Sequence, residues 1–132
     1  MSSDKKRRLN LITLGIFAPV LVLAGVLGFL IPPHPGLTSG APAYNVFHIV
    51  FGTIGIALVW LKKEESIRLF NLGFGAIDLY QALASFLHLF PEQYFRWTSI
   101  DDVLHIIIGI ALVLIGWPNS NRDTGRQPSS PR

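Results

Sequence analysis

Four long apolar runs separated by short polar segments constrain the fold of this chain more than any other feature of its sequence. They extend roughly over residues 9–31, 43–61, 69–90 and 102–117. An α-helix rises ~1.5 Å per residue, and about 20 apolar residues cross the hydrocarbon core of a bilayer. The first and third runs are long enough for this, and the second and fourth are near the short limit of about 17 residues. We therefore predict an all-α membrane protein, a bundle of four transmembrane helices in a lipid bilayer.

The composition agrees with a membrane protein and excludes several other classes. Only 14% of the 132 residues are charged while 50% are hydrophobic, which is too little charge to cover a soluble domain. The chain has no cysteine, which excludes disulfide scaffolds, thiol redox chemistry and cysteine-ligated metal centres. The net charge of +3 comes from basic residues that flank the apolar runs, so we expect no nucleic-acid partner.

The basic residues are distributed asymmetrically around the four runs. Ten of the eleven lie before the first run, between the second and third, or after the fourth, and only Arg96 lies on the opposite side. The positive-inside rule places the side with more basic residues in the cytoplasm. Because the first run is longer than the ~7–15 apolar residues of a signal peptide, we expect it to be retained. We predict a cytoplasmic basic N-terminus at 1–8 and a disordered cytoplasmic tail at 119–132.

The two halves of the chain resemble each other. Residues 45–52 align with 102–109, so that His48 corresponds to His105 and Gly52 to Gly109, with an offset of 57 residues (105 − 48 and 109 − 52). Each half holds two spans and enters the membrane from the same side, which puts the pseudo-twofold axis along the membrane normal. We predict two tandem helical hairpins, which form a parallel internal repeat.

The third run carries polar residues that fall on one side of a helix. At about 100° per residue they lie within an arc of roughly 100°, and they should face the other helices and not lipid. One of them, Asp78, is near the bilayer midplane, where a charged carboxylate costs ~2.5–3.5 kcal/mol. Two roles are therefore open for Asp78. It is either the proton- or ion-coupling site of a transporter subunit, or a protonated carboxyl that forms a structural hydrogen bond with a neighbouring helix. The stripe consists of Asn71, Asp78, Gln81 and Ser85, with His88 at its end.

His48 and His105 open the second and fourth runs at equivalent positions. Glycines share their helical faces, which lets the helices approach closely and turns both rings inward. Asn45 and Asp101 (or Asp102) precede the histidines and are suitable helix N-caps. Such a pair would ligate a b-type haem from opposite sides or would contribute to a metal site, and the alternative is that each ring helps to close its helix start. The candidate ligands of a metal ion are His48, His105, His88 and Asp102.

The motif Asn45-x-x-His48 in the second run and Asp102-x-x-His105 in the fourth resemble a pattern in a family of small bacterial four-span proteins, domain of unknown function 4383. The similarity covers roughly residues 11–117. It implies an integral protein of the bacterial inner membrane with no assigned reaction and no catalytic residue. The family often has asparagine before its second histidine, and here an aspartate takes that place and adds negative charge on the outer side.

We expect a non-enzymatic membrane protein with a structural or interaction role. The segment 62–66 on the inner side is too short to hold a soluble active site, and the chain has no H-E-x-x-H, phosphate-loop or serine-nucleophile motif. Glycine-bearing helix faces favour self-association or a membrane-protein partner. The alternatives are a haem- or metal-binding redox protein that uses His48 and His105, and a transporter subunit that uses Asp78.

Overall fold

The basic segment at the N-terminus continues the first apolar run as one helix. In the computed structural model, which describes residues 1–119, α1 extends over Ser3–Leu30. It begins well before the predicted start at residue 9 because Ser2 accepts a hydrogen bond from the Lys5 backbone N–H. Asp4 lies in the first turn, where the helix dipole favours a negative charge. The basic side chains of this segment therefore project from a helix.

Three more long helices and a short one follow. They are α2 (Pro42–Trp60), α3 (Glu64–Leu87), α4 (Glu92–Phe95) and α5 (Ser99–Gly116), and no strand occurs among residues 1–119. α2 and α5 lie close to the predicted runs, whereas α4 was not predicted. α3 begins before the predicted residue 69 because Glu64 and Glu65 provide an acidic first turn. It ends before the predicted residue 90 because His88 adopts a left-handed conformation with φ 55°. The predicted tail lies outside the described residues, apart from Asn119.

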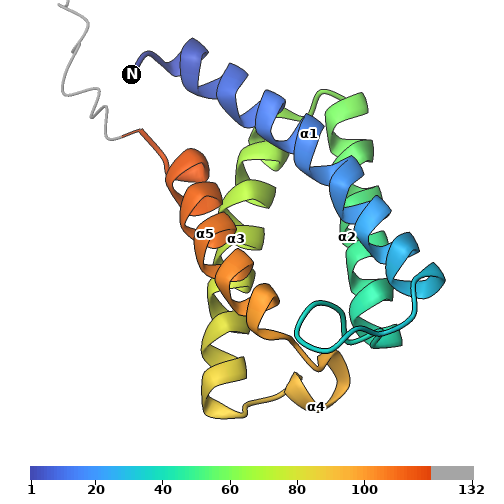
Figure 1. Ribbon diagram of the computed structural model, residues 1–132. Coiled ribbons are helices and arrows are strands. Elements are labelled where there is room, and N and C mark those ends of the chain that lie inside the picture. The colour runs from blue at the N-terminus through green and yellow to red at the C-terminus, as the bar shows by residue number, and fades with distance from the viewer. Residues whose placement is uncertain (120–132) are drawn as a thin grey trace, which may run out of the picture.

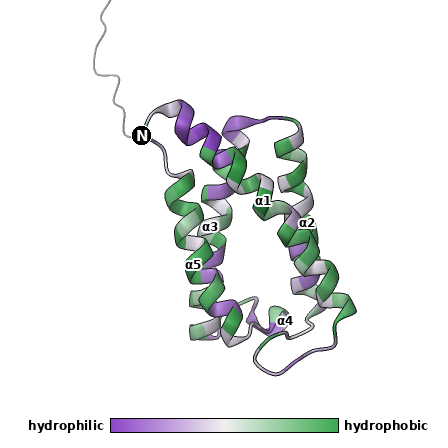
Figure 2. Ribbon diagram, turned by 45° about the horizontal axis from the view of Figure 1, so that its top comes forward, coloured by the Kyte–Doolittle hydropathy of each residue, from purple (hydrophilic) through white to green (hydrophobic). Residues whose placement is uncertain are grey.

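The helices form two hairpins, α1–α2 and α3–α5, and helices of one hairpin contact each other far more than those of different hairpins (Figure 1). The loop 31–41 and α4 lie at one end of the molecule, which we call the loop end. The N-terminus, the α2–α3 turn and the end of α5 lie at the other, which we call the basic end. Figure 2 shows hydrophilic residues gathered in the first turns of α1 at this basic end.

Glycines bring the two helices of each hairpin into close contact at corresponding positions. A Cβ on Gly52 would lie 2.8 Å from the carbonyl oxygen of Ala18, and a Cβ on Gly109 would lie 2.9 Å from that of Gly75. Both contacts are too short for a side chain, so these glycine faces are occupied within the hairpins. Gly109 follows Gly52, and Gly75 follows Ala18, by 57 residues (109 − 52 and 75 − 18), so the two hairpins pack in the same register. At this offset every buried residue of α1 corresponds to a buried residue of α3. The α1 residues are Asn10, Leu14, Ala18, Leu21 and Gly25, and their α3 counterparts, in the same order, are Ile67, Asn71, Gly75, Asp78 and Ala82.

Aromatic side chains fill the space between the two hairpins. The ring of Phe74 on α3 lies 5.6 Å from that of Phe17 on α1, and 5.8 Å and 5.5 Å from those of Phe47 and Phe51 on α2. Such pairs contribute ~0.5–1.5 kcal/mol each beyond the area that they bury. The hairpins are therefore joined through large side chains, and each hairpin is joined internally through its backbone.

Three of the helices, α1, α2 and α5, are long and apolar enough to cross a membrane. Their large apolar side chains are mostly exposed, as in Ile16 (65%) on α1 and Ile107 (60%) on α5. Apolar surfaces this extensive require a lipid environment or a partner. The protein is therefore an all-helical membrane protein.

Candidate functional site

The two histidines of the predicted pair lie at the loop end and share a neighbour, Tyr44. Tyr44 belongs to the first turn of α2 and is only 8% exposed. Its hydroxyl lies 2.8 Å from Nε2 of His105 on α5, which is 5% exposed. Its ring packs on that of His48, one turn further along α2, with centroids 4.2 Å apart. His105 is thus buried, His48 is half-buried, and Tyr44 contacts both rings.

A chain of hydrogen bonds leads from His105 through Tyr44 to Asp101. Tyr44 Oη donates to Asp101 Oδ1 at 3.3 Å. A phenol has one proton to donate, so His105 Nε2 must then carry a proton and donate it to the Tyr44 oxygen. Nδ1 of His105 is left as an acceptor, and it has no partner among the described residues. This arrangement connects a buried imidazole to a carboxylate at the start of α5.

Asn45 does not cap α2, so this prediction is wrong. The helix begins one turn earlier at Pro42, because a proline in the first turn loses no hydrogen bond, and Ala41 occupies the cap position. Asn45 instead packs across the hairpin on Gly28 of α1, where a Cβ would collide with the amide group. Within the described part of the chain its buried Nδ2 has no acceptor. A free donor therefore lies inside the loop end.

The prediction that Asp101 or Asp102 is the N-cap of α5 is also wrong. Thr98 is the N-cap, and Asp101 is the third helical residue of a capping box. The Thr98 hydroxyl accepts from the Asp101 N–H at 3.3 Å, and Asp101 Oδ2 accepts from the Thr98 N–H at 2.8 Å. Asp102 is half-buried, and its Oδ1 has no hydrogen-bond partner among residues 1–119. The capping box fixes Asp101 so that its other oxygen meets Tyr44.

A cavity of about 280 Å³ lies beside these groups, between α1, α2 and the loop 31–41. Its polar wall contains Tyr44, Asn45, His48 and Asp101. His105 does not line the cavity and is connected to it through Tyr44. The lining has one carboxylate and no lysine or arginine, so it suits a cation or a ligand rich in hydrogen-bond donors.

The predicted polar stripe of α3 divides into two networks. Asp78 (3% exposed) accepts a hydrogen bond from Gln81 Nε2 at 3.2 Å, and Gln81 Oε1 accepts one from Trp97 Nε1 at 3.0 Å. This network connects α3 to the segment between α4 and α5. Ser85 is half-buried, and Asn71 belongs to the other network, near the basic end.

The second network joins three helices through Asn10. Asn71 Nδ2 donates to Asn10 Oδ1 at 3.0 Å, and Asn10 Nδ2 donates to the Ile115 carbonyl, also at 3.0 Å. The first bond ties α3 to α1, and the second satisfies a carbonyl in the last turn of α5 that has no partner within its own helix. Neither Asn10 nor Tyr44 was a sequence candidate. A signal for Tyr44 was its place four residues before His48 on the same helical face.

The metal site predicted from His48, His105, His88 and Asp102 stays a prediction. His88 is exposed at the end of α3 and bonds Glu92 through Nδ1 at 3.1 Å. Among residues 1–119 no group of three or more histidine or acidic side chains is placed to hold a metal ion. The b-type haem hypothesis stays a prediction, since His105 would have to release Tyr44 to ligate iron through Nε2. A visible absorption spectrum of the purified protein tests it.

Comparisons of the chain with protein-family models, curated proteins and solved structures found no match.

Proposed function

We propose that α3 also crosses the membrane, which makes four spans arranged as two hairpins of a parallel internal repeat. Its 24 residues reach ~36 Å, more than the ~30 Å hydrocarbon core. Asn71, Asp78 and Gln81, which make it polar, are buried inside the bundle. The common register of the glycine contacts supports the repeat. By the positive-inside rule the basic end faces the cytoplasm. The resemblance to domain of unknown function 4383 favours a bacterial inner membrane.

Within this architecture we propose a non-enzymatic role, the binding of a small cation at the loop end from the outer side of the membrane. The observation that carries this proposal is the cavity lined by Tyr44, Asn45, His48 and Asp101. Buried polar atoms without partners commonly mark an unseen water, ion or ligand. Three of them lie at this end. The acceptors are Asp102 Oδ1 and His105 Nδ1, on residues next to the cavity lining, and the third is the donor Nδ2 of Asn45, which lines the cavity.

Charge favours a cation over a neutral ligand or an anion. Asp101 and Asp102 both lie in the first turn of α5, and of these two only Asp101 lines the cavity. No basic side chain lines the cavity to neutralise it. Attraction between opposite charges is several-fold stronger beside a low-dielectric bundle than in water. The single carboxylate of the lining can therefore attract one small cation, and such binding requires no catalytic group.

Thermal unfolding in detergent with methylammonium chloride, compared with neutral acetamide at equal ionic strength, tests this proposal. We expect methylammonium to raise the unfolding temperature of the wild type, because a ligand that binds only the folded state stabilises it. In Asp101→Asn the shift should disappear, while the amide oxygen can still accept in the capping box. Glu92→Gln, at the same end but outside the cavity, should retain the shift. An equal shift in Asp101→Asn, or none in the wild type, would reject cation binding.

A second candidate is a proton- or ion-coupled transporter subunit, and the environment of Asp78 favours it. Asp78 is buried near the middle of α3, and its one hydrogen bond to a described side chain comes from Gln81. A carboxyl group at this depth, with no basic residue beside it, is a candidate for proton exchange. Four helices enclose little volume, so a pathway would require a dimer. Proteoliposomes should show a pH-dependent flux that Asp78→Asn abolishes and Ser85→Ala retains, and an unchanged flux in Asp78→Asn would eliminate this candidate.

A further inference from the structure

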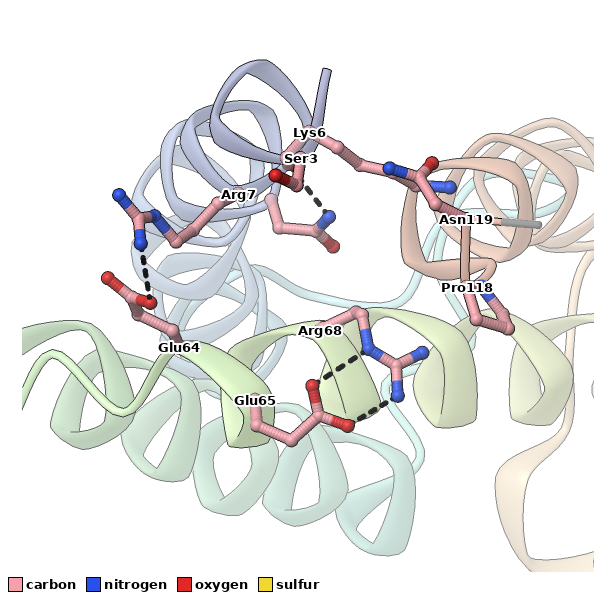
Figure 3. A pocket seen from close by; sticks show the side chains of 9 residues that line it. Ser3, Lys6, Arg7, Glu64, Glu65, Arg68, Pro118 and Asn119 are labelled. Atoms are coloured by element: carbon pink, nitrogen blue, oxygen red, sulfur yellow. Dashed lines mark hydrogen bonds and ion pairs between the residues drawn. The ribbon is translucent and has the colours of Figure 1, made fainter. Parts of the chain in front are cut away.

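A second cavity, at the basic end, lies between the first turns of α1, the start of α3 and the residues after α5 (Figure 3). Its volume is about 440 Å³. Three basic side chains (Lys6, Arg7 and Arg68) and two acidic ones (Glu64 and Glu65) line it. The lining therefore carries one positive charge in excess.

That excess charge belongs to Lys6. Arg68 donates from Nε to Glu65 Oε2 at 3.0 Å and from Nη1 to the last carbonyl of α5 at 2.9 Å. Arg7 donates from Nη1 to Glu64 Oε2 at 3.3 Å, as the dashed line in Figure 3 shows. Lys6 forms no ion pair with any residue that the structure describes. An anion entering the pocket would meet this ammonium group without competition.

An apolar groove of about 360 Å³ follows the pocket along the seam between α1 and α5. Its α1 side consists of Thr13, Ile16, Phe17 and Val20, and Ala111 lies on its α5 side. Almost no polar surface lines the groove. It lies where the two hairpins meet and opens towards the surroundings of the bundle.

The pocket and the groove occupy one continuous face of α1. The pocket uses positions 3, 6, 7 and 10, and the groove uses 13, 16, 17 and 20. Steps of three and four residues are those of neighbours on one face of a helix. From Asn10, the deepest pocket residue of α1, to Val20 the helix rises ~15 Å, half of a ~30 Å hydrocarbon core. The face thus spans one leaflet, with charge at its interface end and apolar side chains below.

We infer that this face binds one anionic phospholipid, with its phosphate beside Lys6 and an acyl chain in the groove between α1 and α5. The inference rests on the proposal that the bundle spans the membrane with its basic end at an interface. A phosphate that is part of an anionic lipid complements the single excess positive charge, whereas a zwitterionic lipid brings its own ammonium group into the pocket. Basic pockets between helices at the cytoplasmic side suit anionic lipid head groups.

Native mass spectrometry of the protein with phosphatidylglycerol and phosphatidylcholine in equal amounts tests the head-group part. We expect one retained phosphatidylglycerol, and about a five-fold weaker affinity in Lys6→Gln, the effect typical of one basic residue near a lipid surface. Lys5→Gln is the matched control, because it removes the same charge one residue away, outside the pocket. Equal losses in the two variants, or equal retention of the two lipids, would overturn the proposal.

A second pair of variants tests the groove. Ala111→Phe fills it and should reduce phosphatidylglycerol retention, whereas Ala76→Phe, on an exposed face of α3, should not. If circular dichroism shows that Ala111→Phe has lost helix content, the comparison of Lys6→Gln with Lys5→Gln decides whether the lipid binds at this face. Displacement of the lipid by soluble glycerol 3-phosphate at similar concentration would show a simple phosphate site and refute the role of the groove. Lys6 does not line the cavity at the loop end, so methylammonium should still raise the unfolding temperature of Lys6→Gln if the cation proposal is correct. The lipid measurement and the methylammonium measurement therefore test the two proposals separately.

Discussion

The substitution Gly109→Ala measures how closely α3 and α5 approach each other. An alanine Cβ at this position would lie 2.9 Å from the Gly75 carbonyl oxygen and 2.9 Å from Leu79 Cγ. The oxygen belongs to the backbone of α3 and cannot rotate away, so the helices must separate by a few tenths of an ångström. Overpacking of this kind costs ~1–3 kcal/mol. Replacing glycine by alanine inside a helix also stabilises it by ~1 kcal/mol, which offsets part of this cost.

Gly73→Ala is the matched control, because it makes the same change in an open position of α3. A Cβ on Gly73 has no atom within 4 Å, so this variant should show only the helix-propensity gain. The free energy of unfolding of Gly109→Ala should therefore be ~1–3 kcal/mol below that of Gly73→Ala. Gly52→Ala, at the corresponding contact of the first hairpin, should behave like Gly109→Ala.

Circular dichroism during thermal or dodecyl sulfate unfolding of the purified protein gives these free energies. Equal stability of Gly109→Ala and Gly73→Ala would mean that α3 and α5 do not touch through their backbones. A loss in Gly109→Ala with none in Gly52→Ala would contradict the common register of the two hairpins.

Two more predictions address the loop end and the topology. Tyr44→Phe removes the hydroxyl that pairs with the buried Nε2 of His105 and should lower the unfolding free energy by ~1–3 kcal/mol. The control Tyr94→Phe changes an exposed ring and should alter the unfolding free energy by less than ~0.5 kcal/mol. Thermal unfolding of both variants checks this prediction. The chain has no cysteine, so single-cysteine variants Ser99→Cys and Ser66→Cys can be labelled in intact cells with an impermeant maleimide. Ser99→Cys should react directly and Ser66→Cys only after permeabilisation, and the opposite result would invert the proposed orientation.

The sequence predicted where the apolar helices lie along the chain, but it predicted the residues at which they begin and end less accurately. α2 and α5 lie near the predicted runs because hydropathy changes sharply at their ends. α1 and α3 begin earlier than predicted because the charged residues before each apolar run are themselves good helix formers. Hydropathy locates the part of a helix that lipid covers and does not detect the turns that extend beyond it.

The candidate site was anticipated in part. The internal similarity led to His48 and His105, which the structure places around one tyrosine. The contact of Tyr44 with His105 joins residues that are 61 positions apart, and that of Asn10 with Ile115 joins residues that are 105 positions apart. No local pattern encodes these two contacts, although the spacing of Tyr44 and His48 was a local signal for Tyr44. The cap prediction for α2 failed because Pro42 can begin a helix without a side-chain cap. The cap prediction for α5 failed because Thr98 takes the N-cap position and Asp101 the third helical position of a capping box.

The separation of the bundle into two internally packed hairpins has a consequence for its biosynthesis. All the close backbone contacts of α1 with α2 form within the first 60 residues, and at ~5–20 residues per second the second hairpin needs ~3–11 s more to be synthesised. During that interval lipid can cover Phe17 and Phe51, which later contact Phe74 of the second hairpin. Asn71 arrives later and finds Asn10 already in place to receive its amide. The order of synthesis thus delivers the polar helix of the protein to partners that are already in the membrane.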